Sequence, residues 1–109
     1  MIRNISLDND NKTFRYKLKP NSTIHGMCVY NSIDNPQVTH NYPLIKLTTQ
    51  IITEENSYLT YRQIIPYSNK IELIDYPLKH RGVIKLIFSI DIQNASQYRG
   101  KVNVIIKYD

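Results

Sequence analysis

The sequence predicts an all-β fold: a single antiparallel β-sandwich, jelly-roll or immunoglobulin-like, with about eight strands over residues 1–109. Apolar residues at helical spacing are nearly absent, and Ile, Val, Thr, Tyr and Phe dominate the apolar positions. Clusters of Asn, Asp, Pro and Gly interrupt these residues at short intervals. Short strands with such closely spaced turn signals are typical of sandwiches and barrels, and 109 residues correspond to one domain.

Period-2 alternation between the turn clusters defines the predicted strands. They cover residues 2–7, 12–19, 23–30, 44–53, 58–65, 70–76, 83–92 and 101–108. The first is short and terminal, so we expect it at the edge of a sheet. The second, KTFRYKLK, alternates without exception, and the seventh, VIKLIFSIDI, has the strongest apolar pattern.

The connections follow from the turn residues between these strands. Turns of hairpin size are predicted at 8–11, 54–57 and 66–69, a loop at 77–82 and a longer connection at 31–43.

Alternation also predicts the core, because successive strand side chains point to opposite faces. The expected inward residues are Phe14, Tyr16, Leu18, Ile45, Leu47, Ile51, Ile84, Leu86, Phe88, Ile90, Ile92, Val102, Val104, Ile106 and Tyr108.

Three aliphatic residues fall on the opposite, outward side of the same count. Val83, Ile87 and Ile105 share this side with lysines such as Lys107. Scattered exposed aliphatics are ordinary, but three of them on adjacent strands would form a patch that a partner protein covers. We therefore include these four residues in a candidate interface.

A row of basic residues completes this candidate interface. Arg15, Lys17 and Lys19 share one face of the second predicted strand, and the chain has a formal net charge of +5. The row fits a solvated strand face, a docking face for an acidic protein, or a contact with nucleic acid. The nucleic-acid alternative needs exposed aromatics on the same face, and the segment SYLTYRQIIPY, with Arg62 among tyrosines, offers the best interleaving.

Signs of catalysis or cofactor binding are absent from the sequence pattern. The acids lie mostly in turns or at outward positions, and the three histidines have no metal-ligand spacing. His25 and Cys28 are three residues apart on one predicted strand, so they face opposite sides, and Cys28 fits a buried thiol. No Gly-rich phosphate loop or nucleophile elbow occurs. We expect a protein that is not an enzyme and holds no cofactor or metal.

Targeting signals are also absent. No apolar run approaches the length that crosses a membrane, and residues 1–10 lack the features of a secretory signal. The expected site of synthesis is therefore the cytoplasm.

The final stretch, ASQYRGKVNVIIKYD, resembles the closing strand of many immunoglobulin-like and jelly-roll structural domains. Pilin-type subunits are also similar, but they are secreted and usually carry a disulfide, which one cysteine cannot form. As a small β-sandwich without a signal, the chain resembles virion proteins of tailed phages, especially auxiliary or decoration capsid proteins of crAss-like phages. This resemblance implies a virion component, made in the host cytoplasm, that binds and stabilises a capsid lattice and can form homo-oligomers. The alternative from the residues is a nucleic-acid-binding β-barrel that uses its basic strand face.

Overall fold

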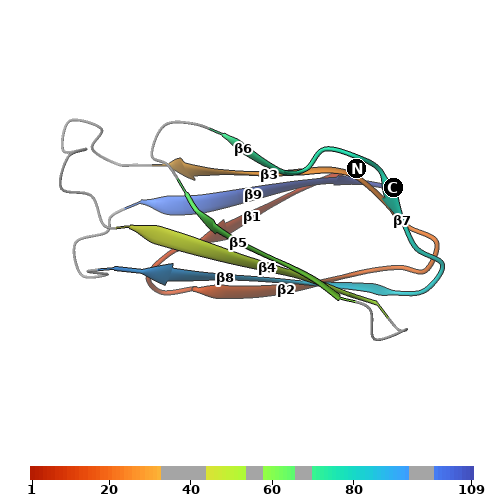
Figure 1. The fold of residues 1–109 in the computed structure, drawn as a ribbon, viewed down its shortest axis with the longest axis horizontal. Coiled ribbons are helices and arrows are strands. Elements are labelled where there is room, and N and C mark those ends of the chain that lie inside the picture. Colours follow the sequence, from red (N-terminus) through yellow and green to blue (C-terminus); the bar gives the residue numbers. More distant parts are fainter. Residues whose placement is uncertain (33–43, 54–57, 66–69, 94–99) are drawn as a thin grey trace.

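The computed structural model describes residues 1–32, 44–53, 58–65, 70–93 and 100–109, without the side chain of Tyr58. Within these ranges the chain contains strands and no helix, and two antiparallel sheets pack face to face (Figure 1). The expected β-sandwich is therefore confirmed. The strands are β1 (Ile2–Leu7), β2 (Thr13–Leu18), β3 (Thr23–Ser32), β4 (Ile45–Thr53), β5 (Tyr58–Ile64), β6 (Ile71–Ile74), β7 (Leu78–Lys79), β8 (Ile84–Ile92) and β9 (Lys101–Tyr108).

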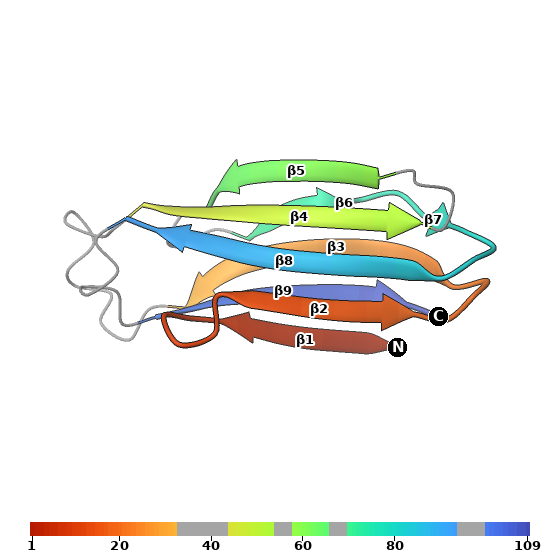
Figure 2. The same cartoon turned by 90° about the horizontal axis from the view of Figure 1, so that it is seen from below.

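The strand order is that of a jelly roll. The first sheet runs β1-β9-β3-β6, with β7 also paired to β3, and the second runs β2-β8-β4-β5 (Figure 2). If β7 is set aside, the first strand pairs with the last, the second with the next to last, and so inward to β4 and β5. Such nested antiparallel pairs, folded over into two sheets, distinguish a jelly roll from an immunoglobulin-like sandwich.

The predicted elements agree with this architecture, with local differences. Strand β1 lies at a sheet edge as expected. The predicted loop at 77–82 contains a ninth strand, β7, because Leu78 packs on the core and Leu78–Lys79 pairs with the start of β3. The turn at 8–11 joins β1 to β2 in the other sheet and so forms no hairpin. The predicted turns at 54–57 and 66–69 and most of the connection at 31–43 lie outside the described residues.

The core lies between the two sheets, where alternation placed it. All five apolar residues expected on the inner side of β8 are buried, and Phe88 is completely enclosed. Phe14, Tyr16 and Tyr108 are half-buried at the margin of this core. The prediction omitted the inward residues of β1 and β3, which are Ile5, Leu7, Ile24, Met27 and Val29.

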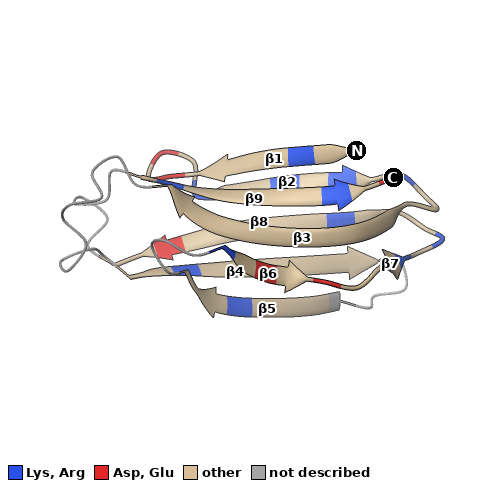
Figure 3. Ribbon diagram, turned by 90° about the horizontal axis from the view of Figure 1, so that it is seen from above, with Lys and Arg blue, Asp and Glu red and all other residues tan. Residues whose placement is uncertain are grey.

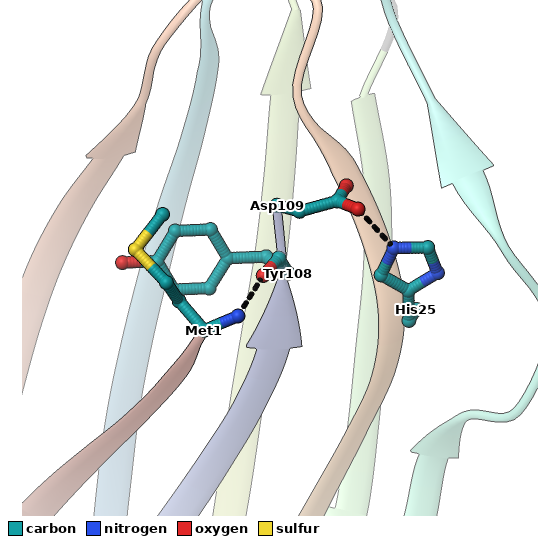
Figure 4. Close-up of polar contacts among 4 residues, drawn as sticks. All are labelled: Met1, His25, Tyr108 and Asp109. Atoms are coloured by element: carbon teal, nitrogen blue, oxygen red, sulfur yellow. Dashed lines mark hydrogen bonds and ion pairs between the residues drawn. The ribbon is translucent and has the colours of Figure 1, made fainter.

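Both ends of the chain are fixed beside each other at one end of the sandwich (Figure 4). The terminal amine of Met1 donates a hydrogen bond of 2.6 Å to the carbonyl oxygen of Tyr108, and the amide of Tyr108 donates one to the carbonyl oxygen of Met1. Asp109 and Thr23 exchange two backbone hydrogen bonds in the same way. Tyr108 also contacts β2, because its hydroxyl shares a hydrogen bond of 2.8 Å with the hydroxyl of Tyr16.

Candidate protein-binding surface

The outer face of the second sheet carries most of the strand cations. Arg15 and Lys17 lie on β2, Lys85 on β8, Lys46 on β4 and Arg62 on β5, and all five are exposed (Figure 3). These five residues are called the basic face below. Asp91 is the one acidic strand residue that the structure describes on this side, so the formal charge there is +4. Among described strand residues, the outer face of the first sheet carries Lys79, Lys101, Lys107 and the acid Glu72.

The pairing register brings two of these cations directly opposite each other. Lys17 on β2 pairs with Lys85 on β8, and the next residue along this row is Ile52 on β4. Like charges at directly opposite positions of an antiparallel pair destabilise the sheet. In the described ranges the two ion pairs join His25 to Asp109 and Lys70 to Glu72, and neither involves the basic face. None of the five cations therefore forms an ion pair with a described acidic group, and Asp91, directly opposite Lys46, is the acidic strand residue described beside them.

The seven residues of the candidate interface do not form one surface. Arg15 and Lys17 belong to the basic face, with Ile87 opposite Arg15 on the neighbouring strand. Lys19 lies beyond the end of β2, in a turn where the hydroxyl of Ser22 donates a hydrogen bond of 2.6 Å to its carbonyl oxygen. Val83 directly precedes β8 and is half-buried.

The expectation that Val83, Ile87 and Ile105 lie on adjacent strands is wrong. Consecutive strands β8 and β9 belong to different sheets, because the chain crosses from one sheet to the other between them. Ile87 therefore lies on the outer face of the second sheet, and Ile105 and Lys107 lie on the outer face of the first. The proposed aliphatic patch does not form.

The sequence did not identify which cations would converge. Alternation alone assigns Lys46 and Lys85 to outward positions, but their proximity to Arg15 and Lys17 depends on the order β2-β8-β4. Arg3 is a further unexpected residue, because it takes an inward position on β1 and remains exposed. Its guanidinium carbon lies 5.9 Å from the ring centre of Phe14 and 5.2 Å from that of Tyr16, within the range of cation–π contacts. Arg3 thus covers the side of the sandwich between β1 and β2.

Base stacking has little support on the described part of the basic face. Phe14, Tyr16 and Tyr61 pack towards the core, and the hydroxyl groups of Tyr16 and Tyr108 share a hydrogen bond of 2.8 Å. Of the other tyrosines in SYLTYRQIIPY, the side chain of Tyr58 and all of Tyr67 lie outside the described residues. A platform of exposed aromatics, typical of single-strand binders, is therefore not found among the described side chains of this face.

The candidate reactive side chains, those of Cys28 and His25, both lie on β3. Cys28 is 5% exposed, as the sequence predicted, and burial raises the pKa of its thiol, which makes it a poor nucleophile at neutral pH. The imidazole Nε2 of His25 lies 3.0 Å from Oδ2 of Asp109 at the chain end (Figure 4). Among the described residues, no three His, Cys, Asp or Glu side chains are placed to hold a metal ion.

The described part of the chain contains no helix that is long and apolar enough to span a membrane. No protein-family model matches the chain, and no curated protein matches it.

Solved structures do match. The NLP core of Drosophila, whose structure was described for its pentamer formation and histone binding, aligns over 99% of this chain and 97% of its own. The TM-score is 0.62 at 8% sequence identity. The protein GEBA250068378 from Sulfurospirillum deleyianum aligns over 100% of this chain and 98% of its own, at 10% identity and a TM-score of 0.39.

A third match comes from the structure of infectious bursal disease virus Gt strain. It covers 96% of this chain and 30% of that chain, at 11% identity and a TM-score of 0.26. The last two scores are too low to support a shared fold. The Drosophila match supports the sandwich fold of this chain.

Proposed function

We propose that this chain is a non-enzymatic, protein-binding structural subunit whose basic face docks on an acidic surface of a partner protein. The observation that carries the proposal is the row in which Lys17 and Lys85 lie directly opposite each other, within a face of five cations. Such an arrangement lowers the stability of the isolated sheet, and carboxylates of a partner would relieve the repulsion.

Charge complementarity also determines which partners this face excludes. Histones are strongly basic, so the histone binding described for the Drosophila protein does not extend to a face with a formal charge of +4.

The setting that fits best is a phage virion, in which the chain acts as an auxiliary capsid protein on a lattice of other subunits. Its support is the resemblance of type to small virion sandwiches, together with the jelly-roll strand order. Quantitative mass spectrometry of purified particles tests this setting. Many copies per particle are expected, and particles that lack the chain would contradict it.

Docking itself is tested with a fluorescein-labelled ten-residue peptide in which glutamate alternates with threonine. Anisotropy at about 50 mM salt measures its affinity under weak screening. Lys17→Glu with Lys85→Glu should abolish binding. The control pair Lys101→Glu with Lys107→Glu makes the same change in net charge on the opposite sheet and should retain most of it. Equal losses from the two pairs would exclude the basic face as the docking surface.

Nucleic acid is the second candidate, because the same cations could follow a phosphate backbone. Engagement of about five phosphates would lower the affinity on the order of 500-fold between 50 and 200 mM salt. Size-exclusion chromatography with light scattering, recorded at 260 and 280 nm, separates the two roles. The protein-docking proposal predicts a species free of nucleic acid, and nucleic acid that dissociates only at high salt would favour the alternative.

A further inference from the structure

Strand β2, at one edge of the basic face, presents outward-pointing backbone N–H and C=O groups as well as cations. In the pair of β2 with β8, the amide of Ile90 donates a hydrogen bond of 2.9 Å to the carbonyl oxygen of Lys12. Antiparallel pairing alternates between residues that bond to the neighbouring strand and residues whose N–H and C=O point away from it. The backbone groups of Thr13, Arg15 and Lys17 therefore point away from β8, towards the open edge of the sheet.

The side chains of the same residues strengthen this edge as a binding site for anions. Arg15 and Lys17 project from the outer face beside their outward-pointing amides, and Lys12 and Lys19 flank them. Charged residues on an edge strand normally oppose pairing with another copy of the same strand, because like charges would meet. The same charges attract a strand that carries carboxylates.

A surface hollow leaves room beside this edge. It has a volume of about 400 Å³ and lies between the last residues of β2 and the paired chain ends. Its lining includes Met1, Tyr16, Lys17, Lys19 and Tyr108. The wall opposite β2 is formed by Met1, Tyr108 and Asp109 at the paired chain ends, and Figure 1 shows β1 converging on β2 only towards the turn that joins them. The hollow leaves the edge accessible at Lys17, and the Arg3 side chain lies over the rings of Phe14 and Tyr16 farther along β2.

The opposite edge of the second sheet, formed by β5, carries fewer cations. The amide of Ile65 donates to the carbonyl oxygen of Ile45, so Thr60, Arg62 and Ile64 of β5 direct their backbone groups outward. Only one of these three residues is charged. The β5 edge has the same backbone geometry without the concentration of cations, so it is a natural internal control.

From this geometry we propose that β2 accepts an extended acidic segment of the partner as an additional antiparallel strand. This inference rests on the proposed docking function and specifies its mode. Glutamates or aspartates at every second position would lie opposite Arg15 and Lys17, and their own amide and carbonyl groups would bond to those two residues. Backbone pairing would supply affinity, and the alternating carboxylates would supply selectivity.

Two methylated forms of the glutamate–threonine peptide test the mode of binding. In an antiparallel pair, the glutamates opposite Arg15 and Lys17 direct their amides at β2, and the threonine amides point away. Methyl groups on the glutamate nitrogens should weaken binding about tenfold or more, since they remove these hydrogen bonds and introduce a clash. Methyl groups on the threonine nitrogens should leave the affinity unchanged, with the same charge and composition.

Substitutions in the chain give an independent test. Lys17→Gln removes a charge, and Lys17→Pro removes the same charge together with the outward N–H, without affecting the bonds of β2 to β8. Lys17→Pro should bind the peptide more weakly than Lys17→Gln by about fivefold. Thermal unfolding of both variants checks that they are folded.

Amide hydrogen exchange in the wild-type chain locates the added strand without any substitution. The peptide should protect the amides of Arg15 and Lys17 and leave those of Thr60 and Arg62 unchanged. If both methylated peptides bind as tightly as the parent and no β2 amide is protected, strand addition is wrong, although acidic docking stands. If the parent peptide fails to bind at low salt, the proposed docking function is wrong as well.

Discussion

Replacement of Lys85 by threonine should stabilise the isolated protein. The Cβ atoms of directly opposite residues lie about 5 Å apart, and flexible stems allow the two ammonium groups to separate to roughly 7 Å. At that distance in water, two like charges repel by about 0.6 kcal/mol. Since Lys85 lies opposite Lys17, Lys85→Thr should raise the free energy of unfolding by about this amount and the Tm by about 2–4 °C.

Urea unfolding at two salt concentrations is the appropriate assay, because repulsion between exposed charges is screened. The gain should be clear at about 20 mM salt and mostly lost at about 500 mM, where the Debye length is shorter than the charge separation. The control is Lys107→Thr, which makes the same change on a strand where the opposite residues are Ile2 and Gly26. An equal gain from both substitutions, or a gain independent of salt, would refute the repulsion between Lys17 and Lys85.

Three further changes test the core and the chain end. Phe88→Ala should lower the free energy of unfolding by about 3–5 kcal/mol, since the ring is completely buried between the sheets, and a loss below about 1 kcal/mol in urea unfolding would contradict its central position. Thr49 is 1% exposed, and its hydroxyl has no hydrogen-bond partner in the described structure. Thr49→Val should therefore raise the free energy of unfolding by about 1 kcal/mol. A lower free energy of unfolding would show that the hydroxyl is hydrogen-bonded. The hydrogen bond from His25 lowers the pKa of the Asp109 carboxyl in the folded protein. The contact therefore stabilises the fold fully at pH values above the unfolded-state pKa of this carboxyl. This stabilisation is lost as the pH falls through the lower, folded-state pKa. Between pH 5 and 2, therefore, the wild type should lose more stability than Asp109→Asn, and parallel acid-denaturation curves would exclude this linkage.

Local alternation was sufficient to predict the strands and much of the core. The inward set of β8 was correct because every second residue from Ile84 to Ile92 is apolar. Strand β3 was harder to interpret, because Cys28 is buried on the outer side between the inward residues Met27 and Val29. The pairing of β3 with β9 also shifts register between Ile24 and Gly26, so the inward residues Ile24 and Met27 lie three apart and the alternation is interrupted. Strand β7 is two residues long, too short for any periodicity.

The candidate surface depends on pairings between strands that are distant in sequence. The basic row of β2 was visible from Arg15, Lys17 and Lys19, but its continuation through Lys85 and Lys46 requires β8 to lie between β2 and β4. The separation of Ile87 from Ile105 likewise follows from the crossing between sheets after β8. Alternation determines the side of a strand on which a residue lies, whereas tertiary packing determines which strands become neighbours.

The most direct test of acidic docking on the basic face is an amide NMR titration of the isotope-labelled chain with the glutamate–threonine peptide. The proposal predicts chemical-shift changes centred on Arg15, Lys17 and Lys85, with little change at Lys101 and Lys107. Changes centred on Lys101 and Lys107, or spread equally over both sheets, would contradict it.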